Sequence, residues 1–102
     1  MFELEKLVQL IGRLQELFFD EGPIEDDDFL VFQTFNDKRF FVSVPYTGHE
    51  FSIKFSSVSN EPEYNVTIWD HDEDKDGISL LFRYGDKESS TKIANAIYTH
   101  IF

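Results

Sequence analysis

The stretch Glu-Phe-Ser-Ile-Lys-Phe-Ser-Ser, residues 50–57, decides the fold class. Phe51, Ile53 and Phe55 alternate with small or polar residues, which is the period-two pattern of a β-strand with one buried face. The same alternation recurs in other stretches rich in β-branched and aromatic residues. It predicts five strands, near residues 29–35, 38–44, 50–57, 64–70 and 78–84.

The connections between these strands are too short to hold crossover helices. The first is a tight turn at Asn36-Asp37, and the last is the acidic stretch 70–77. A parallel pair of strands needs a dozen or more connecting residues. Consecutive strands should therefore pair antiparallel, as a meander.

Apolar residues return to helical spacing at both ends of the chain. Over residues 3–20 they recur every three or four positions, as Leu4, Leu7, Val8, Ile11, Leu14, Leu17 and Phe18. After Gly85 the same spacing is seen at Ile93, Ala94, Ile97, Tyr98 and Ile101, and Asp86, Ser89 and Ser90 are candidate helix caps. We expect residues 1–102 to form a single acidic α+β domain of order α-β-β-β-β-β-α. Its five-stranded, mainly antiparallel meander sheet would be flanked by the two helices.

The second face of the predicted sheet is partly apolar. Leu30 and Phe32 have opposite parity to Val31, and Trp69 has opposite parity to Ile68. Either the helices cover opposite faces, or both lie on one face and wrap over the sheet edge. A third interpretation is an exposed aromatic patch around Trp69 that binds a partner or a second copy of the chain.

Charge is concentrated in two short segments. The chain has 20 acidic and 9 basic residues, a net charge of −11. Residues 20–28 contain six acids and no base, and residues 70–76 contain five acids and one base, so these segments hold −10 of that charge. In a meander, the entry to the first strand and the second and fourth connections between strands lie at one end of the sheet. We therefore expect an acidic pole there, formed by Asp26–Asp28, His49-Glu50 and Asp70–Asp76.

An acidic pole of this kind predicts a docking surface for a basic protein. Carboxylates on alternate residues of an extended loop stand ~7 Å apart, a spacing that suits Lys and Arg side chains which would otherwise hold phosphates. The expected function is that of an immunity protein or antitoxin, an inhibitor of a nuclease or another nucleic-acid-handling enzyme. The predicted partner-binding residues, with Tyr46 and Trp69 as aromatic anchors, are Asp26, Asp27, Asp28, Tyr46, Glu50, Trp69, Asp70, Asp72, Glu73, Asp74 and Asp76.

Other interpretations of the same residues stay open at this point. The acids could serve only to solvate the loops of a Phe-rich sheet. Asp72-x-Asp74-x-Asp76-Gly77 is similar to the opening of an EF-hand calcium loop, although Arg83 stands where that loop needs a bidentate Glu. A small acidic secretion chaperone would use the partly apolar sheet face, although such chaperones carry a helix between the third and fourth strands.

The residues favour a binding protein over an enzyme. The chain has no Cys, which excludes a disulfide framework, a zinc–thiolate site and a Cys nucleophile. No P-loop, dinucleotide fingerprint, G-x-S-x-G or H-E-x-x-H motif occurs, and His49, His71 and His100 are scattered, so we expect no catalytic residue, metal or cofactor.

The charge and the apolar pattern also limit the expected partners and location. The acidic pole would repel phosphates, which argues against direct binding of nucleic acid. No apolar run approaches the ~20 residues of a membrane span, and the start of the chain has no basic leader pattern, so we expect a cytoplasmic protein that does not bind membranes. The sequence does not distinguish a monomer from a homodimer.

Overall fold

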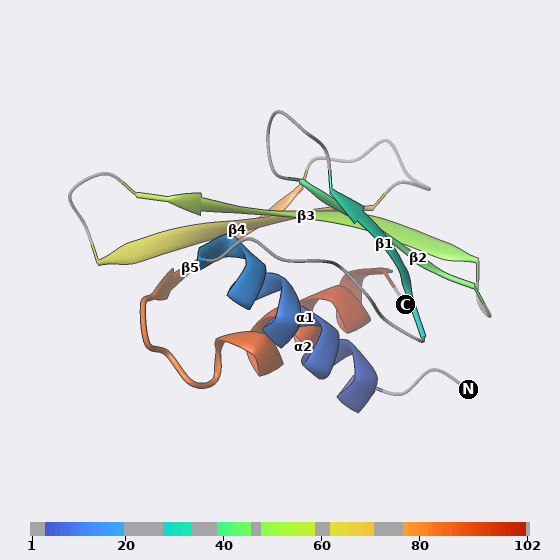
Figure 1. The fold of residues 1–102 in the computed structure, drawn as a ribbon, viewed down its shortest axis with the longest axis horizontal. Helices are drawn as coiled ribbons and strands as arrows, with labels where there is room; N and C mark the ends of the chain where they lie inside the picture. The colour runs from blue at the N-terminus through green and yellow to red at the C-terminus, as the bar shows by residue number, and fades with distance from the viewer. Residues whose placement is uncertain are drawn as a thin grey trace.

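The computed structural model describes residues 4–19, 28–33, 39–45, 48–58, 62–70 and 77–101, apart from the side chains of residues 17–19. Its elements follow the expected order and make an α+β fold (Figure 1). They are α1 (Leu4–Phe19), β1 (Leu30–Gln33), β2 (Phe40–Val44), β3 (His49–Ser57), β4 (Glu63–Asp70), β5 (Ile78–Arg83) and α2 (Ser89–Ile101).

The five strands form one antiparallel sheet in the order β1-β2-β3-β4-β5. The predicted meander is thus confirmed. β3 and β4 begin at His49 and Glu63, one residue earlier than expected, because pairs with Val44 and Arg83 extend the ladders. β5 ends at Arg83, since Gly85 with a φ of 89° turns the chain toward α2.

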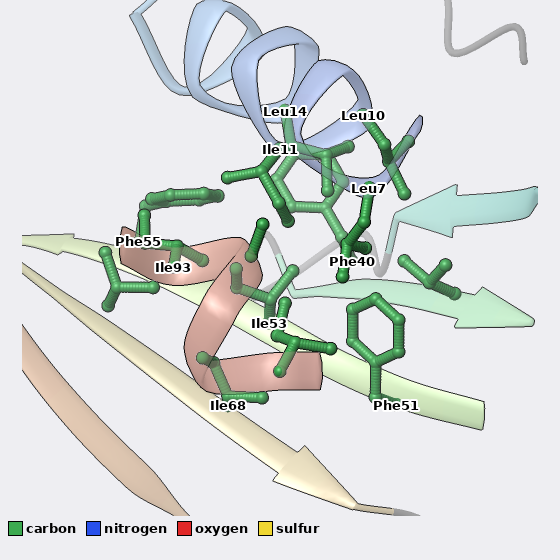
Figure 2. Packing of buried hydrophobic residues seen from close by; sticks show 14 of the residues in the cluster. Leu7, Leu10, Ile11, Leu14, Phe40, Phe51, Ile53, Phe55, Ile68 and Ile93 are labelled. Atoms are coloured by element: carbon green, nitrogen blue, oxygen red, sulfur yellow. The ribbon is translucent and has the colours of Figure 1, made fainter. Parts of the chain in front are cut away.

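Both helices lie on the same face of the sheet and pack against each other (Figure 1). Of the two arrangements considered for them, the one-face arrangement is therefore correct. Figure 2 shows how side chains from the helices and from one face of the strands meet in a single core. Its fully buried members include Leu7, Leu10, Ile11, Leu14, Phe40, Phe51, Ile53, Ile68, Ile93 and Ile97.

A buried polar cluster joins α1, β4 and α2 at one end of this core. Gln15 Nε2 donates to the Tyr64 hydroxyl at 2.7 Å and to Ser89 Oγ at 2.9 Å, and Ser90 Oγ donates to Gln15 Oε1. Ser89 and Ser90 are thus engaged with Gln15. Of the three candidate caps, Asp86 accepts a hydrogen bond from the Glu88 amide at 2.9 Å, in the turn that leads into α2.

Candidate protein-binding site

The sheet brings three separate chain segments to one end. Leu30, Ser43 and Glu50 are direct cross-strand neighbours, and Phe51 in the next row pairs with Asp70, the last residue of β4. Adjacent strands are about 5 Å apart, so the start of β1, the start of β3 and the end of β4 lie within roughly 15 Å across the sheet. This end of the sheet is where the acidic pole was expected, and Asp28, Glu50 and Asp70 are its described carboxylates.

Seven of the predicted partner-binding residues lie outside the described residues. They are Asp26, Asp27, Tyr46, Asp72, Glu73, Asp74 and Asp76. The described residues on either side of them fix where each segment is attached. The segment 71–76 leaves from Asp70 and returns to Gly77, and both attachment points are at the acidic pole.

Asp28 is already engaged by a cation of the same chain. Lys6 Nζ lies 3.1 Å from Asp28 Oδ1, and both side chains are nearly half exposed. This contact places the first turns of α1 at the acidic pole. Gln15, in contrast, contacts Tyr64 at the opposite end of the sheet. The last turn of α1 and Asp28 therefore lie toward opposite ends of the sheet.

The other two described carboxylates point to opposite sides of the sheet. Glu50 is exposed and belongs to the face opposite the helices, where Ser43 Oγ donates to it at 3.5 Å. Asp70 is half-buried and shares the helix-facing parity of its partner Phe51. The described carboxylates therefore lie on both faces at this end of the sheet. Among the described residues, no group of three or more His, Cys, Asp or Glu is placed to hold a metal ion.

Trp69, predicted as an anchor, is half-buried on the face opposite the helices. The Arg39 guanidinium carbon lies 4.1 Å from the centroid of its ring. The edge of the indole lies over Gly77, where an added Cβ would come within 2.7 Å of Trp69 Nε1. One surface of the ring is therefore covered by Arg39, and the sequence pattern gave no sign of this contact.

Among the described residues near the acidic pole, the most exposed apolar side chains are on β1 instead. Leu30 is 64% exposed and Phe32 is 61% exposed. The Phe32 ring stacks on Phe41, with 5.2 Å between ring centroids and 13° between ring planes. The sequence prediction of partner-binding residues does not include Leu30 or Phe32, although their opposite parity to Val31 in the first strand was the available signal.

Comparison with known proteins finds no relative of this chain. No protein-family model, curated protein or solved structure matches it. Among the described helices, none is long and apolar enough to cross a membrane.

Proposed function

We propose that this chain is a binding protein that neutralises a basic partner protein by covering it with the acidic pole. The observation that carries the proposal is the convergence of Asp28, Glu50 and Asp70 at one end of the meander. Asp28 and Asp70 belong to the two segments, residues 20–28 and 70–76, that hold −10 of the net charge of −11. Outside these segments the chain is close to electrically neutral, and both segments are attached at the acidic pole, one through Asp28 and the other through Asp70 and Gly77.

Concentrated charge of one sign serves binding in two ways. It attracts a partner of opposite charge over several ångströms and raises the association rate by one to three orders of magnitude at low salt. It also orients the partner, because only the basic surface of the partner is attracted to the pole. The same arrangement is unfavourable for the free protein, since like charges repel one another until a partner neutralises them.

The class of partner that fits best is an enzyme that handles nucleic acid, such as a nuclease toxin. Such enzymes carry Lys and Arg side chains that hold phosphates, and carboxylates can form charge-assisted hydrogen bonds with the same side chains. Occupying those cations would block the partner's substrate without any chemistry by this chain. This is the function of an immunity protein or enzyme inhibitor.

The test is a capture experiment with matched charge variants. The tagged chain is exposed to a lysate of its own cells at ~0.1 M and ~1 M salt, salt concentrations that span weak and strong screening. The test variant carries Asp72→Lys, Asp74→Lys and Asp76→Lys. The control variant carries Glu16→Lys, Glu63→Lys and Glu88→Lys, at positions away from the acidic pole, so both variants change the net charge from −11 to −5.

We expect the wild type and the control variant to retain one stoichiometric basic protein at low salt. The test variant should lose it, and high salt should weaken the capture. Retention of the same protein by all three baits, or loss from both variants equally, would contradict a role for the acidic pole.

A further inference from the structure

The face opposite the helices carries an apolar surface that no described helix covers. We call Leu30, Phe32, Phe41 and Trp69 the outer patch. Three of them belong to one cross-strand row, in which Phe32 pairs with Phe41, Phe41 with Ser52, and Ser52 with Trp69. Leu30 and Phe32 are exposed by 64% and 61%, and a contiguous exposed apolar patch is typical of an interaction site.

The outer patch is continuous with the acidic pole. Leu30 belongs to the same cross-strand row as Glu50, and the row of Phe32 and Trp69 is the next one on this face. Residues two apart on a strand are about 7 Å apart, so the patch begins directly beside the pole. Trp69 also immediately precedes Asp70, the attachment point of the acidic segment 71–76.

The charges around the patch are unevenly distributed. Glu50 and the acidic pole border it on one side. Arg39 and Lys54 follow on the other side, because Lys54 is two residues beyond Ser52 on β3 and Arg39 lies over Trp69. A positively charged partner on the patch is therefore attracted toward the pole on one side and repelled by Arg39 and Lys54 on the other. This pattern of charge limits where the partner can bind.

The net charge decides between two possible occupants of the patch. A second copy of this chain would bring another −11 and a second acidic pole, and the two poles would repel each other. A basic partner gains electrostatic energy at the pole while it buries the patch. The basic partner is therefore the occupant that the charge distribution favours.

From these observations we infer that the partner presents an apolar segment next to its cluster of Lys and Arg, and that this segment binds the outer patch. This inference rests on the proposed function and names the second half of the interface. Charge at the pole would set the speed and orientation of binding, whereas burial of Leu30 and Phe32 would slow dissociation.

The test uses two peptides of equal charge. KKKKGFLF joins a basic segment to an apolar one, and KKKKGSSS replaces the apolar residues by serine. Their affinities are measured by anisotropy of a peptide label at ~0.05 M salt, and the emission of Trp69, the only Trp in the chain, reports contact with the patch. The double variant Leu30→Ser with Phe32→Ser removes the exposed apolar groups. The control Leu81→Ser removes a leucine that is 57% exposed on the same sheet face at the opposite edge.

We expect the wild type and Leu81→Ser to bind KKKKGFLF about ten-fold more tightly than KKKKGSSS, a difference typical of burying one or two apolar side chains. The Leu30→Ser, Phe32→Ser variant should bind both peptides equally, with the affinity that the wild type has for KKKKGSSS. KKKKGFLF, and not KKKKGSSS, should change the emission of wild-type Trp69.

Three outcomes would overturn the inference, and they are distinguishable. Equal, salt-dependent binding of both peptides by the wild type would leave the proposed function intact and remove the patch from it. Binding of neither peptide would count against the acidic pole itself. Sedimentation showing a wild-type dimer that the Leu30→Ser, Phe32→Ser variant converts to a monomer would assign the patch to a second copy.

Discussion

The guanidinium carbon of Arg39 lies 4.1 Å from the centroid of the Trp69 ring, on the face of the sheet opposite the helices. Trp69 belongs to the outer patch and immediately precedes Asp70, where the acidic segment 71–76 is attached, so this contact lies between the cationic and the anionic part of that face. A cation over an indole ring is attracted to it by the ring's negative face.

Replacing Arg39 by Met should lower the free energy of unfolding by about 1 kcal/mol, since the cation–π attraction is lost while most of the apolar stem remains. The emission of Trp69 should shift at the same time, because one face of its ring loses its charged neighbour. Urea unfolding followed by Trp69 fluorescence measures both effects. Lys54→Met, which removes a cation from the same face, should change stability by less than about 0.5 kcal/mol. An equal loss in both variants would mean that Arg39 acts only through its charge.

Replacing Gln15 by Leu should destabilise the fold by about 2 kcal/mol, because it leaves buried hydroxyl groups on β4 and α2 without their amide partner. Tyr64→Phe removes one of these hydroxyls and should cost about 1 kcal/mol. The double variant should be more stable than the sum of the two losses predicts, since each change removes the partner of the other. Strict additivity in urea unfolding would argue that Gln15 and Tyr64 are not energetically coupled.

Replacing Gly77 by Ala should lower stability by roughly 1–3 kcal/mol, because the added methyl group overpacks the contact between Gly77 and Trp69. The added Cβ would lie 2.7 Å from Trp69 Nε1 and 3.0 Å from the Ile68 carbonyl oxygen. The side chain of Trp69 can move, whereas the backbone carbonyl is held in the β4–β5 ladder. A thermal unfolding midpoint equal to that of the wild type would show that there is room for a side chain at position 77.

Neutralising the acidic segment should stabilise the free protein. Asp72→Asn, Asp74→Asn and Asp76→Asn together change the net charge from −11 to −8 and reduce repulsion at the pole. We expect the gain in unfolding free energy to be greatest at ~0.01 M salt and to vanish near ~1 M, where the screening length is about 3 Å. A loss of stability at low salt would contradict this expectation and would favour a bound cation that these carboxylates hold.

The fold could be predicted because two simple signals agree. The alternation over residues 51–56 identifies a half-buried strand, and connections too short for a crossover leave only an antiparallel meander. Which face the helices cover could not be derived in this way. Helical spacing gives each helix an apolar stripe, but it does not say on which side of the sheet the stripe lies.

The acidic pole could be located from topology and composition alone, whereas its contacts could not. Lys6 and Asp28 are 22 positions apart in the sequence, and their ion pair depends on the direction in which α1 crosses the sheet. Gln15 resembles an ordinary polar position of an amphipathic helix, and only the packing of α2 shows that it is buried. Such long-range pairs carry no local pattern that a sequence could reveal.

The most direct test of the central claim is the association rate constant between this chain and the basic protein it captures, measured by stopped-flow at ~0.05 M and ~0.5 M salt. We predict that the rate constant falls at least ten-fold with salt in the wild type and in the Glu16→Lys, Glu63→Lys, Glu88→Lys control. We also predict that the Asp72→Lys, Asp74→Lys, Asp76→Lys variant associates at least ten-fold more slowly at low salt than that control of equal net charge. A rate constant that is the same for both variants, or that does not depend on salt, would contradict binding through the acidic pole.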